Sequence, residues 1–328
     1  MERAPPNQSK NIALLEYSWD NGDEVSNYIA TTLKEYLNMK LDPSESLEIE
    51  AKLGIVIPSQ EINISDPFYK IWSIPNGLIL PEQKFMSSTC NKTLYYFNPG
   101  VTKEKFDLLI KIFSKECEKR KDQIPVDRDE GTIERYKQEY LINDLGTTYR
   151  IDRMFDDGTR QTYDEDELKE CIKKHKLKHI NYWNHGRDFR ITISVEEKCE
   201  ETKSFKIVNT RHKTRRTFQF KWMRFDFTES AEEDMNGKKS EPKYEIELEI
   251  CDTKFFNQPD FVIYTRLASR FVQNIYSLTN ALSNGEEIFY DSTCQPDLDK
   301  AYKEAYETEV MPIVGDYLSA KAFADKMT

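Results

Sequence analysis

The sequence predicts an α+β protein in which a closed antiparallel β-barrel with a charged interior is covered by helices. Several segments alternate charged and apolar residues with a period of two, which is the period of a strand. The charges are also separated by sign, because some of these strands carry mainly acids on their polar face and others mainly bases. Amphipathic segments with apolar residues at helical spacing would cover the outward apolar faces of such a barrel.

The composition limits the class of protein. The chain has 328 residues, of which 32% are charged and 12% aromatic, and this is typical of a folded protein with a sizeable core. Its net charge of −11 argues against a protein that coats DNA or RNA through a basic surface. The six cysteines are scattered and no apolar run is long enough to span a membrane. We therefore expect a soluble protein with reduced thiols and no membrane contact.

The amino-terminal part contains a leader, a helix and an alternating strand. Residues 1–24 are polar and are expected to be a flexible leader. Apolar residues at helical spacing predict a helix over 26–38. Residues 47–55 then alternate, which places three charged side chains on one face of a strand, namely Glu48, Glu50 and Lys52.

The next part is punctuated by turn residues. Residues 57–88 contain several prolines and are expected to form strands or loops over the core. Residues 102–121 are amphipathic at a period of 3.6, which predicts a packed helix. Residues 134–141 and 147–153 are expected to form a hairpin around the turn-like residues Asn143-Asp144-Leu145-Gly146.

The middle of the chain continues in strands. Phe155-Asp156-Asp157-Gly158 predicts a turn, and residues 167–180 are ambiguous between helix and strand. On a helix, His175 and His179 would be one half of a metal site, but surface histidines in a lysine-rich run are the preferred interpretation. Residues 189–196 alternate without a break and predict a strand that ends in a glutamate.

Two further strands carry bases. The first has basic side chains at every second position, Arg211, Lys213 and Arg215. The second has a mixed polar face, made by Arg224, Asp226 and Thr228. An isolated basic strand is usually a solvated surface or a nucleic-acid patch, but these strands lie in the same sheet-forming region as the acidic ones.

The strand over residues 244–250 is the most acidic. It places Glu245, Glu247 and Glu249 on one face, where neighbouring carboxylates roughly 7 Å apart repel by roughly 2.5 kcal/mol at a dielectric constant of about 20. One interpretation is an ordinary half-buried strand whose acids are solvated and screened. The other is that the acids face an enclosed space and hold a divalent cation. Residues 47–55 repeat the pattern, and the two acidic strands could pair.

The carboxy-terminal part begins with a helix and ends in an acidic extension. Apolar spacing predicts a long helix within residues 255–282. Residues 285–328 are acidic and weakly amphipathic, and they pack on the core or recruit a partner. We therefore expect one folded domain over residues 25–284.

A barrel with its charged faces inward would enclose a polar tunnel lined with acids and bases. Carboxylates bind a hard cation and bases bind phosphate oxygens, so this composition suits a polyanion that carries a metal. A carboxylate would activate water, and the cations would stabilise the charge that develops on the transferred phosphoryl group. No Walker A loop, Rossmann fingerprint, kinase motif or Ser-His-Asp arrangement is evident.

The ordered set of strands resembles the triphosphate tunnel metalloenzymes, and in particular the fungal and protozoan type of mRNA-capping RNA 5′-triphosphatase. The resemblance covers residues 45–283. It is carried by Glu48-Ile-Glu50, Tyr149-Arg150-Ile151, Ile172-Lys173-Lys174-His175, Asp188 to Glu196, Arg211-x-Lys213-x-Arg215, Arg224-x-Asp226-x-Thr228 and Glu245-Ile-Glu247-Leu-Glu249. It implies a closed, eight-stranded antiparallel barrel in a nuclear protein that removes the γ-phosphate from 5′-triphosphate RNA and leaves a diphosphate end, the first step of cap formation.

The same resemblance implies a role for each matching residue. The ligands of Mn²⁺ or Mg²⁺ would be Glu48, Glu50 and Glu249. The residues that orient or activate the attacking water would be Glu196 and Glu247. The triphosphate would be held by Arg150, Lys174, Arg211, Lys213 and Arg215, of which Arg150, Lys213 and Arg215 are also expected to act in catalysis. The wall of the tunnel would be supported by Arg224, Asp226 and Glu245, with help from Arg211.

The implied partners are the 5′ end of nascent RNA, the mRNA guanylyltransferase and the RNA polymerase II machinery, and fungal relatives suggest a homodimer. Two alternatives stay open from the residues. One is a tunnel-fold enzyme that acts on inorganic polyphosphate or small triphosphates, including an adenylate-cyclase-like relative. The other is a non-catalytic module that binds polyanions, although such a module gains nothing from five glutamates in its pocket.

Overall fold

The computed structural model describes the central part of the chain. The described residues are 22–58, 78–80, 84–87, 90–93, 95–121, 129–131, 133–134, 142–184, 188–201, 206–234 and 237–284. Most of the expected leader and the whole of the expected acidic extension lie outside them. Residues 22–24, expected in the leader, instead begin the first helix.

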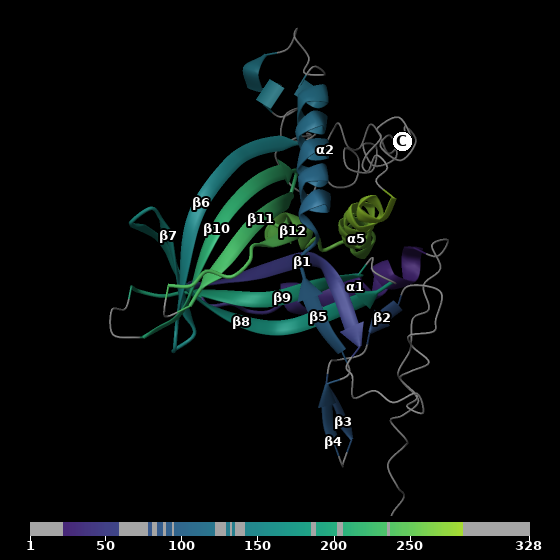
Figure 1. Cartoon of the computed structure of the whole chain (residues 1–328). Coiled ribbons are helices and arrows are strands. Elements are labelled where there is room, and N and C mark those ends of the chain that lie inside the picture. Colours follow the sequence, from purple (N-terminus) through teal and green to yellow (C-terminus); the bar gives the residue numbers. More distant parts are fainter. Residues whose placement is uncertain are drawn as a thin grey trace, which may run out of the picture.

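Eight antiparallel strands close into a barrel, which confirms the predicted fold class (Figure 1). The strands are β1 (Glu45–Pro58), β6 (Asn143–Phe155), β7 (Thr159–Asp164), β8 (Glu167–Trp183), β9 (Asp188–Lys198), β10 (Ile207–Phe220), β11 (Met223–Glu233) and β12 (Lys243–Ile250). Their order around the barrel is β12-β11-β10-β6-β7-β8-β9-β1. The pairing of β1 with β12 closes it.

The closing contact joins the two acidic strands. Glu50 lies opposite Glu249, and Lys52 lies opposite Glu247. Because side chains of directly opposite residues share a face of the sheet, this register brings acids from both ends of the sequence to one place. Apolar residues between them, such as Ile49, Ile246 and Leu248, are buried on the other face of the same strands.

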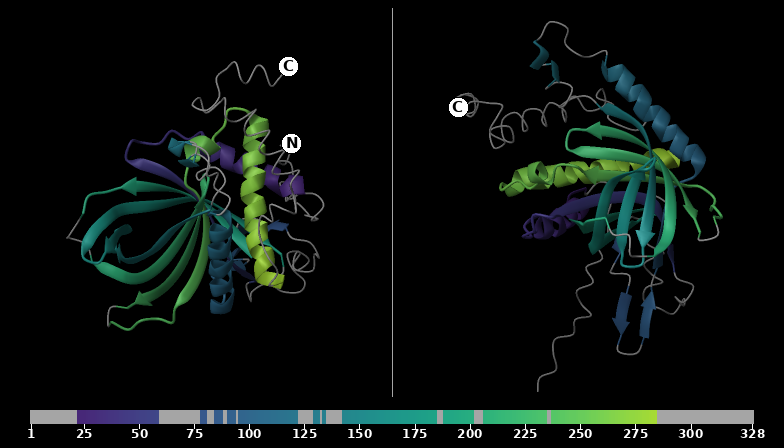
Figure 2. Two further views of the ribbon diagram at one scale, coloured as in Figure 1. Left: turned by 90° about the horizontal axis from the view of Figure 1, so that it is seen from above. Right: turned by 90° about the vertical axis from the view of Figure 1, so that its left-hand side faces the viewer.

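The outer, apolar faces pack against helices (Figures 1 and 2). The helix α2 (Lys103–Lys121) inserts Phe113 among Phe218, Phe225 and Phe227 of β10 and β11, with ring centroids 4.9–5.2 Å apart. The helix α5 (Phe261–Asn284) follows a single turn, α4 (Thr253–Phe256), and Tyr276 of α5 packs against Phe189 of β9 at 5.7 Å.

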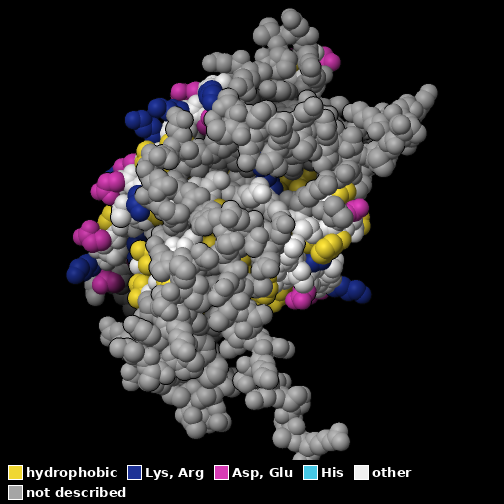
Figure 3. All heavy atoms as spheres, turned by 90° about the vertical axis from the view of Figure 1, so that its right-hand side faces the viewer, with side chains coloured by type: hydrophobic (Ala, Val, Ile, Leu, Met, Phe, Trp, Pro, Cys, Tyr) yellow, Lys and Arg dark blue, Asp and Glu magenta, His cyan; other side chains and the backbone are white. Residues whose placement is uncertain are grey.

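A further helix, α1 (Gly22–Leu37), lies beside α5, where the Tyr264 hydroxyl donates to the Ala30 carbonyl at 2.6 Å. The core therefore lies between the barrel wall and the helices, and the interior of the barrel is left to charged residues. On the outer face shown in Figure 3, acidic and basic side chains of described residues lie interspersed rather than sorted by sign.

Four short strands lie outside the closed barrel. They are β2 (Leu78–Leu80), β3 (Lys84–Ser87), β4 (Cys90–Thr93) and β5 (Tyr95–Pro99). The strand β5 pairs with the end of β1 beyond the barrel, and β3 and β4 pair with each other. Of these, β2 and β3 agree with the strands or loops expected over residues 57–88, although much of that range is outside the described residues.

The predicted hairpin around Asn143–Gly146 is wrong at its turn, because these residues lie inside β6. Gly146 has a φ of +86° and pairs with Thr217, whereas Phe218 pairs with Asp144. Leu145 is thus an extra, unpaired residue, and the turn-like sequence marks a β-bulge with glycine in the left-handed region. Residues 135–141, the other expected arm, lie outside the described residues, and Glu134 is helical.

The predicted turn at Phe155–Gly158 is confirmed, since β6 ends and β7 begins there, and Gly158 donates its N–H to the Phe155 carbonyl at 3.0 Å. The ambiguous residues 167–180 form the strand β8. No helix among the described residues is both long and apolar enough to cross a membrane.

Candidate functional site

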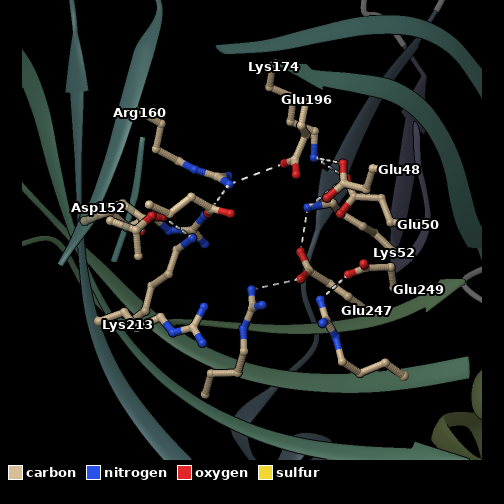
Figure 4. Close-up of a pocket in the computed structure, with 16 residues that line it drawn as sticks. Glu48, Glu50, Lys52, Asp152, Arg160, Lys174, Glu196, Lys213, Glu247 and Glu249 are labelled. Carbon is tan, nitrogen blue, oxygen red and sulfur yellow. Dashed lines mark hydrogen bonds and ion pairs between the residues drawn. The ribbon is translucent and has the colours of Figure 1, made fainter. Parts of the chain in front are cut away.

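The interior of the barrel holds a charged cavity of about 230 Å³ (Figure 4). Sixteen residues line it, and all but one are ionisable: Glu48, Glu50, Lys52, Arg150, Asp152, Arg160, Thr162, Glu170, Lys174, Glu196, Arg211, Lys213, Arg215, Arg224, Glu247 and Glu249. Eight of them are cationic and seven are acidic, so the lining is close to neutral when every group is charged.

The alternation of each strand explains why these side chains face inward. Successive residues of a strand point to opposite faces, so one inward residue fixes its neighbours at i ± 2. The registers then align inward residues across strands, with Lys213 opposite Arg150 and Lys174 opposite Glu196. In Figure 4 the labelled carboxylates and cations converge on a shared centre.

The acids of β1 are paired with lysines. Lys174 forms an ion pair with Glu48 and lies 3.3 Å from Glu50, and Lys52 lies 3.4 Å from Glu50. The Ser194 hydroxyl also donates to Glu48 at 2.8 Å. Burial raises the pKa of Glu50, and the neighbouring carboxylates Glu247 and Glu48 raise it further. The pKa of Glu48 is lowered, because Lys174 and Ser194 outweigh its burial.

The acids of β12 differ from one another in their surroundings. Glu247 contacts Lys52 at 2.6 Å and Arg215 at 3.3 Å, and these cations hold its pKa well below the usual range although the side chain is buried. Glu249 pairs with Arg224 alone among the described cations. Burial therefore raises the pKa of Glu249 to about 7, against the opposing effect of Arg224.

Asp226 and Glu245 lie behind the lining and anchor its arginines. Asp226 accepts from Arg215 at 3.0 Å and from Arg224 at 3.1 Å, and Glu245 pairs with Arg211. These contacts fit the support role that the sequence suggested for both acids, because they fix the guanidinium groups that face the cavity.

Two cations on adjacent strands differ in their partners. Lys213 forms an ion pair with the buried Asp152, and burial lowers the pKa of Lys213. Arg150, directly opposite on β6, is exposed and has no carboxylate partner among the described residues. It is therefore available to an anion without the loss of an existing ion pair.

The structure brings eleven of the sequence-predicted site residues into one cavity lining: Glu48, Glu50, Glu249, Glu196, Glu247, Arg150, Lys174, Arg211, Lys213, Arg215 and Arg224. The remaining two, Asp226 and Glu245, lie directly behind them. Their functional roles stay predictions.

Sequence reasoning missed five lining residues: Lys52, Asp152, Arg160, Thr162 and Glu170. Lys52 and Asp152 lay within predicted strands, residues 47–55 and 147–153, but received no role. Arg160 lies on β7, a strand of only six residues that the sequence analysis did not predict. Its guanidinium lies 3.4 Å from Glu196 and 3.5 Å from Glu170. The alternation of Arg160 and Thr162 after the Asp157-Gly158 turn was the available signal.

Glu196 is only loosely tied to cations, since its ion pair with Arg160 is as long as 3.4 Å. Burial raises its pKa, and the charge of Glu48 acts in the same direction, against Arg160 and Lys174. His175 and His179 lie on opposite faces of β8 and do not come together, because a register shift separates them.

Three carboxylates of the cavity have the oxygen ligands that a hard divalent cation prefers, but they are not arranged as a metal site. Glu48, Glu50 and Glu249 are buried or half-buried carboxylates on adjacent strands of one face. The pKa values of Glu50 and Glu249 are raised by burial and, to a smaller degree, by neighbouring carboxylates, and a bound cation would offset both effects. Within the described residues, however, no three acidic, histidine or cysteine side chains are close enough for a preformed metal site. Their oxygens face Lys174, Lys52 and Arg224 instead.

Comparisons with known proteins agree with this architecture. A family model described as mRNA capping enzyme, beta chain, matches residues 21–284. The structure of Schizosaccharomyces pombe Pct1 RNA triphosphatase superposes with a TM-score of 0.60 at 18% identity, over 78% of this chain and 92% of that chain. Pct1 in complex with the Spt5 CTD gives the same values. No curated protein sequence matches significantly. At this identity the structural likeness shows the fold.

Proposed function

Because the matching model spans residues 21–284, the chain belongs to the family of mRNA capping enzyme beta chains, and we propose that it is a metal-dependent RNA 5′-triphosphatase. The observation that carries the proposal is the charged cavity inside the closed barrel. It is lined by eight cations and seven acids, so a triphosphate and a metal cation could be bound together in one tunnel.

The reaction is the attack of water on the γ-phosphorus. The bond between the γ-phosphorus and the β,γ-bridging oxygen breaks, and diphosphate-ended RNA leaves with the electron pair. Charge grows on the phosphoryl oxygens in this step, and preorganised cations stabilise it. Arg150, Lys213 and Arg215 are suited to this role because they line the cavity from adjacent strands.

Glu196 is the better candidate for the base that takes the proton of the attacking water. A base works best when its pKa approaches the working pH, and burial raises the pKa of Glu196. The pKa of Glu247 is strongly lowered by Lys52 and Arg215, so its carboxylate is better suited to orienting these two cations.

The cation, Mn²⁺ or Mg²⁺, would be held by Glu48, Glu50 and Glu249. When bound, it would supply positive charge to the phosphate oxygens. The same carboxylates would have to exchange their present side-chain partners for it, and the released Lys174 and Arg224 would then be available to the triphosphate.

We also infer a place in the capping apparatus of the nucleus. The substrate would be the 5′ end of nascent RNA, and the diphosphate product is what a guanylyltransferase consumes. The Spt5 CTD bound to Pct1 supports a contact with the RNA polymerase II machinery, and a homodimer is an expectation from the family resemblance.

The test is release of phosphate from γ-labelled triphosphate-ended RNA with Mn²⁺, with Mg²⁺ and with a chelator, against ATP and tripolyphosphate as rival substrates. We expect release from RNA only with metal. Glu196→Gln should abolish it, whereas Glu197→Gln, on the outward face of β9, should not. No release from RNA under any metal condition refutes the proposal, and a preference for tripolyphosphate or ATP would favour a small-substrate enzyme.

A further inference from the structure

A second group of cations lies on the tunnel face of β8 and β9, beside the acidic strands β1 and β12. On β9, the inward residues continue from Glu196 through Ser194 and Thr192 to Arg190, which lies opposite Lys52 of β1. Arg190 is therefore displaced from Glu48 toward one end of the barrel. Glu170, which precedes Lys174 on β8, lies toward the opposite end.

Arg190 has no carboxylate partner among the described residues. Its Nε donates to the Asn181 side chain at 2.6 Å, its guanidinium stacks over Phe97 at 4.7 Å, and one terminal nitrogen is buried without a hydrogen bond. Burial lowers the pKa of Arg190, and the opposing effect of Tyr95 does not outweigh it. A guanidinium in this state has hydrogen-bonding capacity left for an anion.

Two residues of β8 also face the tunnel here, and a bulge in the strand turns the second of them inward. Lys176 pairs with Ser194, whose hydroxyl contacts Glu48, so Lys176 shares the tunnel face. The register then shifts between Lys176 and Lys178, and His179 pairs with Thr192 on the same face. Without the extra residue, His179 would face outward, because side chains alternate along a strand.

Lys176 is exposed and, among the described residues, has no ion-pair partner. The pKa of His179 is lowered to about 4, first by burial and then by the charges of Arg190, Lys176, Lys174 and Lys52. No carboxylate among the described residues therefore neutralises Lys176 or Arg190. Arg160 differs, because Glu170 lies 3.5 Å from its guanidinium.

We propose that Lys176, His179 and Arg190 bind the sugar–phosphate backbone of the RNA nucleotides that follow the 5′-triphosphate. The inference rests on the proposed function and places the RNA chain along the tunnel face of β8 and β9. Unpaired cations on a tunnel face attract backbone phosphates without regard to sequence, and the Phe97 ring beside Arg190 fits a single strand better than a duplex. A neutral His179 can exchange a hydrogen bond with a ribose hydroxyl.

The test compares substrates that share the triphosphate and differ in the nucleotides. For the double variant Lys176→Ala/Arg190→Gln, kcat/KM with a triphosphate-ended RNA of ten nucleotides should fall about tenfold, because KM rises. The slope of log kcat/KM against log salt concentration should become less steep by about 0.7 for each backbone phosphate that the variant no longer binds. Hydrolysis of tripolyphosphate should change less than about twofold. The matched control is Lys173→Ala, an outward lysine of β8 that pairs with Asp157, and it should behave as wild type.

An equal fall with both substrates would overturn the proposal, because it would place these residues in the triphosphate pocket or in the fold. No change with either substrate would overturn it too. The binding of a 5′-hydroxyl RNA, followed by fluorescence anisotropy, needs no hydrolysis. Weaker binding by Lys176→Ala alone would support the RNA site even if phosphate release failed, and unchanged binding would refute it.

Discussion

Asp226→Asn tests whether the tunnel wall is supported by charge. Asp226 is 1% exposed and accepts hydrogen bonds from Arg215 at 3.0 Å, Arg224 at 3.1 Å and the Thr217 hydroxyl at 2.7 Å. The substitution keeps the size of the side chain but leaves two partly buried guanidinium groups without this anion. Removing one partner of a buried ion pair typically costs about 3–5 kcal/mol. Since Arg215 and Arg224 keep Glu247 and Glu249 as partners, we expect about 3 kcal/mol.

The assay is urea unfolding followed by circular dichroism. With a slope of about 3 kcal/mol per molar urea, this loss would lower the midpoint by about 1 M. The matched control is Asp144→Asn, because Asp144 also pairs with an arginine, Arg216 at 2.6 Å, but on the exposed side of the barrel. That change should cost less than about 1 kcal/mol. If Asp226→Asn costs no more than Asp144→Asn, the wall is held by packing and the reasoning about Asp226 fails.

Three other perturbations separate function from stability. Arg150→Ala and Lys213→Ala should each slow phosphate release by about 10²–10³-fold. Only Lys213→Ala should also lower the melting temperature, since it leaves a buried carboxylate unpaired; equal melting temperatures would contradict this pairing. The pKa of Glu249 is raised from 4.5 to about 7, so its contribution to stability is fully present below pH 4.5 and is lost as the pH rises to about 7. Glu249→Gln should make the free energy of unfolding depend less on pH between about 4.5 and 7. If this pH dependence does not change, the Glu249 carboxyl is ionised throughout the window. A Cβ at Gly54 would collide with the Asn98 carbonyl oxygen of β5 and lie 2.7 Å from the Phe97 ring, so Gly54→Ala should cost about 1–3 kcal/mol in unfolding experiments. An unchanged midpoint would show that β5 yields to the methyl group.

The inward faces could be predicted because charge and period were both visible in the sequence. A strand such as β12 has one arrangement that buries Ile246 and Leu248, and it sends Glu247 to the other face. The same rule placed Arg150 and Lys213 in the cavity before their register was known. These assignments needed only the local alternation of each strand, and this is why they survive in the structure.

The pairing of charges could not be predicted in the same way, because it depends on register between strands. The bulges at Leu145 and near Leu177 shift the registers of β6 and β8, and neither is distinguishable in the sequence from a turn or a regular strand. The second bulge also reverses the face of His179. Arg160 was missed for a related reason, since β7 is too short to show a periodic pattern.

The ion pairs of the cavity suggest why metal and triphosphate would bind together. Glu48 and Glu249, two proposed metal ligands, face Lys174 and Arg224, which are cations that a phosphate would attract. Carboxylates taken by a metal release these cations, and cations taken by a phosphate release the carboxylates. Binding of either ligand therefore breaks ion pairs that the other would otherwise have to break. By linkage, the metal strengthens phosphate binding by the same factor as the phosphate strengthens metal binding. The nearly neutral lining keeps the empty tunnel stable by internal pairing, while Arg150, without a carboxylate partner among the described residues, offers the first contact to an incoming phosphate.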